Sequence, residues 1–87
     1  MVKQLLVIYA HWCPVCNMMM PIVEEMEADN LERLQVTKID VDTQPDVYEI
    51  YGIQTIPTFI IYRKQQEVGR MSGMIGEEIL KERVFAE

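Results

Sequence analysis

The chain has 87 residues, 49% of them hydrophobic and 25% charged, and its formal net charge is −6. A chain of this length makes one small domain, so we expect a single domain over residues 1–87. The negative charge repels the phosphate backbone of nucleic acids, and no apolar stretch reaches the roughly 20 residues that cross a membrane. We therefore expect a protein that binds neither nucleic acid nor membrane. We also expect a monomer.

Two elements are predicted in the first third of the chain. Residues 4–10 form a continuous run rich in Leu, Val, Ile and Tyr, which is typical of a central strand buried on both faces. The next stretch has helical spacing, with an apolar stripe made of Val15, Met18, Met19, Ile22, Val23 and Met26. Pro21 lies inside this helix and is expected to bend it rather than end it.

The remaining sequence alternates strands and helices. Strands are predicted over residues 34–41, 58–62 and 67–71, and helices over residues 45–51 and 76–87. The terminal helix has one apolar face, made of Ile79, Leu80, Val84 and Phe85. The first two strands are joined by a helix, which makes them a parallel pair with a right-handed crossover. The predicted fold class is α/β, in the order β-α-β-α-β-β-α, with a four-stranded mixed sheet flanked by helices.

The motif Trp12-Cys13-Pro14-Val15-Cys16 contains the only two cysteines and directly follows the first predicted strand. If a helix begins at Cys13, the two cysteines lie about one turn apart, near the Cα separation of roughly 5 to 6 Å that a disulfide prefers. The free N–H groups and the dipole at that helix end favour a thiolate. We therefore predict Cys13 as the nucleophile and Cys16 as the resolving thiol.

A structural disulfide and a zinc site are the alternatives for this pair. A bridge that encloses two residues removes little entropy from the unfolded chain, and structural zinc usually has four ligands, whereas His11 is the only histidine here. We therefore predict no metal and no bound cofactor, with a redox-active Cys13–Cys16 disulfide as the redox group. A lone Cys-x-x-Cys without a secretion signal indicates a reducing cytoplasm.

With these features the chain resembles the thioredoxin family over essentially its whole length. Trp12 precedes the first cysteine, Pro21 lies five residues after Cys16, and Gly73 matches the family's glycine on the last strand beside the substrate groove. The resemblance implies a short form of the thioredoxin-like fold, without the family's leading strand and helix.

The segment at residues 55–58, Thr-Ile-Pro-Thr, resembles the family segment whose proline is cis and faces the disulfide. By this resemblance, the backbone of Ile56 is free to bind a substrate peptide in extended form, and Pro57 fills the space beside Cys13. The substrate-binding residues implied are Trp12, Pro14, Val15, Ile56, Pro57 and Gly73.

The chain departs from the family where the proton of the resolving thiol is handled. Val7 stands where thioredoxins carry a buried aspartate, although Lys38 matches the lysine that partners this aspartate. The acceptor of the Cys16 proton therefore stays open between water and His11, and Lys38 is the further candidate for proton transfer. A surface histidine without a role is the simpler interpretation of His11.

The resemblance implies a thiol–disulfide oxidoreductase that reduces protein disulfides through a mixed disulfide, in electron transport and cell redox homeostasis. Its reductant would be a thioredoxin-reductase-type flavoprotein or glutathione. The proline directly after Cys13 is more like glutaredoxins, but residues 72–77 lack the paired glycines and following aspartate with which glutaredoxins hold glutathione. The alternatives are a glutathione-dependent glutaredoxin-like reductase and a non-enzymatic, redox-switched binding module.

Overall fold

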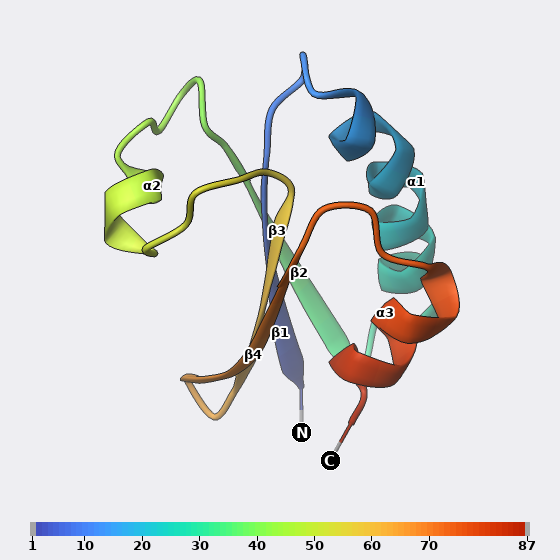
Figure 1. Ribbon diagram of the computed structural model, residues 1–87. Coiled ribbons are helices and arrows are strands. Elements are labelled where there is room, and N and C mark those ends of the chain that lie inside the picture. The colour runs from blue at the N-terminus through green and yellow to red at the C-terminus, as the bar shows by residue number, and fades with distance from the viewer. Residues whose placement is uncertain (1, 87) are drawn as a thin grey trace.

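A computed structural model describes residues 2–86 and arranges them as a sheet with helices on both faces (Figure 1). In chain order the elements are β1 (Lys3–Tyr9), α1 (Pro14–Asp29), β2 (Leu34–Asp40), α2 (Val47–Ile50), β3 (Thr58–Arg63), β4 (Gln66–Ser72) and α3 (Glu77–Val84). The predicted α/β class, element order and four-stranded mixed sheet are confirmed. Only α2 and α3 are clearly shorter than their predicted helices, and residue 87 lies outside the described residues.

Four chain segments meet at one edge of the sheet, the edge where β1 and β2 end. Its strand order is β2-β1-β3-β4, in which β1 and β2 are parallel and the other pairs are antiparallel. The residues after Tyr9 and after Asp40 therefore emerge side by side, because these two residues pair in register. Thr58 pairs with Ser72 at the same edge, where β3 begins and β4 ends. The loops at this edge carry the cysteine motif, the proline segment and Gly73.

Helices cover the two faces of the sheet unequally. The two longer helices, α1 and α3, lie on one face, and the single turn of α2 lies on the other (Figure 1). Leu5 and Val7 of β1 belong to the core on the α1 and α3 face, whereas Leu6 and Ile8 belong to the core on the α2 face. The prediction that β1 is buried on both faces is therefore confirmed.

The helical stripe of α1 is narrower than the sequence predicted. Met18 is 60% exposed, because the buried row of α1 consists of Cys16, Met19, Val23 and Met26. Successive residues of a helix are about 100° apart, which turns Met18 away from this row toward solvent. The helix continues past Pro21 to Asp29, as predicted.

A similar correction applies to α3. Leu80 and Val84 are fully buried and one turn apart, while Ile79 is 54% exposed. Phe85 is partly buried against the same core, just past the end of the helix. Within residues 2–86, none of the helices has the length and apolar character that a bilayer crossing requires.

Candidate active site

The two cysteines lie at the start of α1. Cys13 is the N-cap residue, with extended backbone angles (φ −91°, ψ 114°), and Pro14 is the first helical residue. Proline suits that position because its fixed φ matches the helix and the amide hydrogen it lacks would have no helical partner. The backbone N–H of Cys16 donates a hydrogen bond to Sγ of Cys13 over 3.2 Å. The helix therefore begins where the sequence predicts, and the free N–H of Cys16 in its first turn points at the sulfur of Cys13.

Both thiols are free, and they differ in their contact with solvent. Cys13 retains 6% exposure, whereas Cys16 is fully buried within an apolar cluster that includes Ile8 and Ile60. This burial, helped by the hydrogen bond with Cys13, raises the pKa of the Cys16 thiol to about 11. Cys16 is therefore a neutral thiol near pH 7, and Cys13 is the one that meets solvent.

The proline segment approaches the first cysteine from the sheet. The Ile56–Pro57 peptide bond is cis, and the carbonyl oxygen of Ile56 lies 4.0 Å from Sγ of Cys13. Pro57 is buried, and its carbonyl accepts a hydrogen bond of 2.9 Å from the N–H of Gly73. Gly73 has a φ of +84° and follows β4, which ends at Ser72. The structure thus brings Cys13, Ile56, Pro57 and Gly73 to one place.

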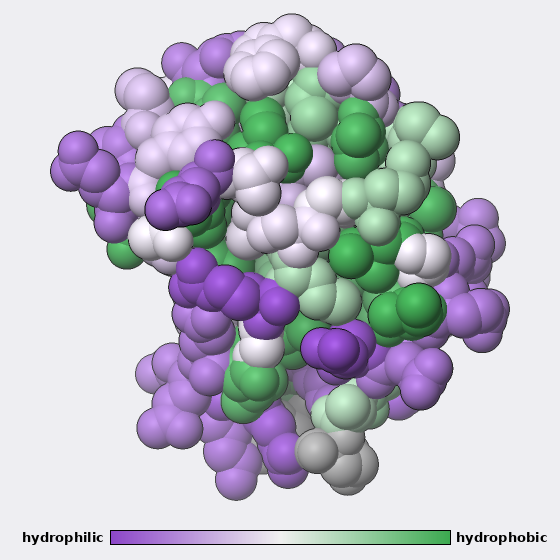
Figure 2. All heavy atoms as spheres, in the orientation of Figure 1, coloured by the Kyte–Doolittle hydropathy of each residue, from purple (hydrophilic) through white to green (hydrophobic). Residues whose placement is uncertain are grey.

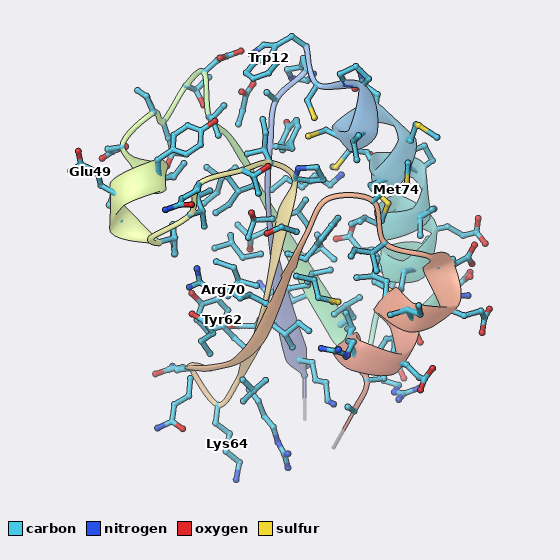
Figure 3. All side chains as sticks on the ribbon, viewed as in Figure 1. Trp12, Glu49, Tyr62, Lys64, Arg70 and Met74 are labelled. Atoms are coloured by element: carbon cyan, nitrogen blue, oxygen red, sulfur yellow. The ribbon has the colours of Figure 1, made fainter. Side chains whose placement is uncertain are left out.

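Trp12 stands beside this place on the molecular surface. Its side chain is 64% exposed, and its Nε1–H donates a hydrogen bond of 3.1 Å to Oδ1 of Asp42. Figure 3 shows Trp12 at the end of the molecule that carries the start of α1, opposite Lys64 at the β3–β4 turn. Pro14 and Val15 lie between the two cysteines in the first turn of α1; Pro14 is exposed and Val15 is partly buried.

The candidates for proton transfer are each bound to a carboxylate. Nε2 of His11 lies 3.3 Å from Oδ2 of Asp40, and the His11 side chain is 75% exposed. Nζ of Lys38 lies 3.0 Å from Oε2 of Glu24 on α1.

Asp40 and Asp42 were missed by the sequence analysis. Each contacts a residue about 30 positions earlier in the chain, and the one signal that could have revealed them is the parallel pairing that places the loop after β2 beside the loop after β1.

Apolar side chains surround the thiols on one side. Figure 2 shows hydrophobic side chains gathered over the start of α1 and the loop after β4, while the β3–β4 turn is hydrophilic. Met74, next to Gly73, is 52% exposed and lies beside α1 (Figure 3). Among residues 2–86, no group of three or more His, Cys, Asp and Glu side chains is arranged to hold a metal ion. The arrangement suits thiol chemistry beside an apolar surface.

The chain is similar in sequence to known proteins. The sequence model of the thioredoxin family matches residues 2–86. A thioredoxin-like protein of Synechocystis is 41% identical over 66 residues, which cover 76% of this chain and 63% of that protein. A bifunctional thioredoxin reductase/thioredoxin of Mycobacterium leprae is 36% identical over 72 residues, which cover 83% of this chain and 16% of that protein. The chain thus spans less than two thirds of either relative.

A solved structure is similar over nearly the whole chain. The germline-specific thioredoxin Deadhead of Drosophila superposes with a TM-score of 0.85 at 28% sequence identity, covering 94% of this chain and 77% of that one.

Proposed function

Because the chain belongs to the thioredoxin family, we propose that it is a thiol–disulfide oxidoreductase that reduces protein disulfides with Cys13 and Cys16. The observation that carries this proposal is the hydrogen bond from the N–H of Cys16 to Sγ of Cys13 at the start of α1. A donor at that distance stabilises negative charge on the sulfur of Cys13, as does the positive end of the helix. A thiolate is the form that attacks disulfides.

The reaction has two exchange steps. The Cys13 thiolate attacks one sulfur of the substrate disulfide, so the substrate S–S bond breaks, a mixed disulfide forms and the second substrate sulfur leaves as a thiolate. Cys16 then loses its proton and attacks Sγ of Cys13, which releases the first substrate sulfur and leaves a Cys13–Cys16 disulfide. Two electrons pass from the protein to the substrate, and the protein needs no bound cofactor because the cysteine pair carries them.

We assign water as the acceptor of the Cys16 proton. Val7 offers no acid at the position where the family carries a buried aspartate. Within residues 2–86, no hydrogen bond or ion pair joins His11 or Lys38 to Cys16; His11 is 75% exposed and lies against Asp40, and Lys38 pairs with Glu24. Since Cys16 is buried, deprotonation would be slow near pH 7 and would limit the second step.

The substrate would bind as an extended segment across the end of the sheet. The carbonyl of Ile56 faces Cys13, and the N–H of Gly73 donates a hydrogen bond to the carbonyl of Pro57. The main chain of a substrate can therefore approach Ile56 and Gly73 together. The docking surface on either side would be Trp12, Pro14 and Val15. Its apolar character favours segments of protein over small charged disulfides.

The reductant we favour is a thioredoxin-reductase-type flavoprotein. The Mycobacterium leprae relative is a bifunctional thioredoxin reductase/thioredoxin, and this chain matches part of it. Glutathione is the alternative. We further propose that the protein works as a monomer in the reducing cytoplasm, in electron transport and cell redox homeostasis.

A coupled assay tests the proposal. The oxidised protein and a disulfide-bonded protein substrate are supplied either with NADPH and thioredoxin reductase, or with glutathione, glutathione reductase and NADPH. We expect substrate-dependent NADPH oxidation in the first mixture and little in the second. Turnover with glutathione alone would reverse the choice of reductant, and inertness of the folded protein in both mixtures would overturn the proposed activity.

A further inference from the structure

The end of β2 and the loop after it contact both residues that precede Cys13, His11 and Trp12. Oδ2 of Asp40 lies 3.3 Å from Nε2 of His11, and Oδ1 of Asp40 accepts a hydrogen bond of 2.9 Å from the N–H of Asp42. Asp42 in turn accepts the hydrogen bond of 3.1 Å from the indole of Trp12. The two oxygens of one carboxylate are therefore linked to two neighbouring side chains, one directly and one through Asp42.

Asp40 itself is fixed in place by the backbone around it. It is the last residue of β2, and the next residue, Val41, donates a hydrogen bond of 2.9 Å to the carbonyl of Tyr9 on β1. The carbonyl of Asp40 accepts hydrogen bonds from the N–H groups of Thr43 and Gln44, at 3.1 and 3.0 Å. Its side chain is only 16% exposed. A carboxylate held this firmly can position groups that are less firmly held.

The two side chains linked to Asp40, one directly and one through Asp42, are held less firmly. His11 and Trp12 lie in the turn between β1 and α1, and their side chains are 75% and 64% exposed. On the helix side, the amide of Asn17 donates a hydrogen bond of 3.0 Å to the carbonyl of His11. The backbone of this turn is thus bound to α1, whereas the side chains of His11 and Trp12 are bound to the end of β2 and the loop after it.

We propose that Asp40 is a positioning residue, which holds His11 and Trp12 in place on the surface where a substrate docks beside Cys13. The proposal rests on the proposed function, because a substrate must dock there for the exchange. Within residues 2–86, no hydrogen bond or ion pair joins Asp40 to either thiol, so it would act on binding of the substrate rather than on the sulfur chemistry. The expected effect of its loss is therefore a higher KM with little change in kcat.

The fold should tolerate the loss. The ion pair contributes little to stability because its His11 partner is 75% exposed, and residue 40 keeps its backbone hydrogen bonds in any variant. The side chains it positions should respond more strongly, since one lost hydrogen bond corresponds to about a two- to tenfold change in an equilibrium. Asp40→Ala and Asp40→Asn are therefore usable variants.

Trp12 is the only tryptophan, so its fluorescence reports directly on this anchor. We expect Asp40→Ala to shift Trp12 emission, to increase its quenching by acrylamide and to raise KM for a disulfide substrate about two- to tenfold, with kcat within about twofold of wild type. Asp40→Asn should be intermediate, because its amide oxygen still accepts from the N–H of Asp42. Glu24→Ala is the matched control, since it also removes a carboxylate from an ion pair, the one with Lys38, which does not include Trp12. It should leave Trp12 emission and KM unchanged.

Emission and KM that are the same for Asp40→Ala and Glu24→Ala would overturn the positioning role. If Asp40→Ala does not fold, as judged by circular dichroism, Asp40→Asn decides: unchanged emission together with unchanged KM overturns the proposal. A wild type that reduces no disulfide would instead overturn the proposed function, and the emission spectra would still show whether Asp40 holds Trp12.

Discussion

The N–H of Cys16 donates a hydrogen bond to Sγ of Cys13 over 3.2 Å, so the resolving residue also supports the nucleophile through its backbone. Cys16→Ser removes the resolving sulfur and keeps this N–H. We therefore expect the Cys16→Ser protein to attack substrates and to stop at the mixed disulfide, which accumulates at about one substrate per protein. Non-reducing electrophoresis and mass spectrometry of the adduct measure this.

Cys13→Ser is the control for this trap, because it leaves only the fully buried thiol of Cys16. It should form no adduct and show no reductase activity. An equal yield of adducts from both variants would contradict the assignment of Cys13 as the nucleophile.

The high pKa of Cys16 makes the stability of the reduced protein depend on alkaline pH. The thiol has a pKa of 9.0 as its ordinary value and about 11 in the folded state, so above pH 9 the unfolded chain loses this proton while the folded chain keeps it. The contribution to the free energy of unfolding is therefore complete below pH 9 and falls by on the order of 2 to 3 kcal/mol as the pH rises toward 11. Urea unfolding under reducing conditions at pH 8 to 11 measures the fall.

Cys16→Ala is the control for the pH series, since it removes only this titration. Burial and the neighbouring Tyr51 also raise the pKa of Tyr62, which adds an alkaline loss of stability to both proteins. The difference between wild type and variant isolates Cys16. Parallel losses in the two proteins would show that the thiol is not the group that titrates.

The order of the elements could be predicted because their signals are local. The continuous apolar run in β1 and the helical spacing of α1 are properties of neighbouring residues, and so is the proline that begins α1 directly after Cys13. The positions of the two thiols could be predicted for the same reason.

What could not be predicted depends on contacts between distant residues. Asp42 meets Trp12 across 30 positions, and the acids of the loop after β2 look like ordinary surface charges in the sequence. The exposure of a residue at the margin of a helical stripe could not be predicted either. Apolar spacing alone places Met18 with Met19, and only the packing of α1 on the sheet makes one exposed and the other buried.

The neighbouring methionines of α1 should differ widely in their effect on stability. Met19 is fully buried and packs with Val23 and Phe59, whereas Met18 is 60% exposed. Met19→Ala should lower the free energy of unfolding by about 2 to 5 kcal/mol, because it removes buried apolar volume and leaves a cavity. Met18→Ala should change it by less than about 0.5 kcal/mol. Denaturant unfolding of both variants compares them directly, and equal losses would mean that α1 is rotated on the sheet.

Gly73 should be intolerant of a side chain because of its backbone and not because of crowding. Its φ is +84°, and a Cβ built there meets nothing within 4 Å. Gly73→Ala should therefore lower the free energy of unfolding by about 1 to 2 kcal/mol through the left-handed backbone alone. It should also lower kcat/KM about two- to tenfold, since the N–H of Gly73 holds the carbonyl of Pro57 over 2.9 Å beside the proposed docking surface.

Gly76 provides the comparison for this effect. A Cβ built at Gly76 also meets nothing within 4 Å, but its φ is −61°, which any residue adopts. Gly76→Ala should leave activity unchanged and change stability by less than about 1 kcal/mol, because the reduced freedom of the unfolded chain offsets the poorer fit of alanine at the N-cap of α3. Thermal unfolding and reductase kinetics of the two variants separate the causes. If Gly76→Ala were as damaging as Gly73→Ala, space in the loop after β4 rather than the backbone of Gly73 would be the constraint.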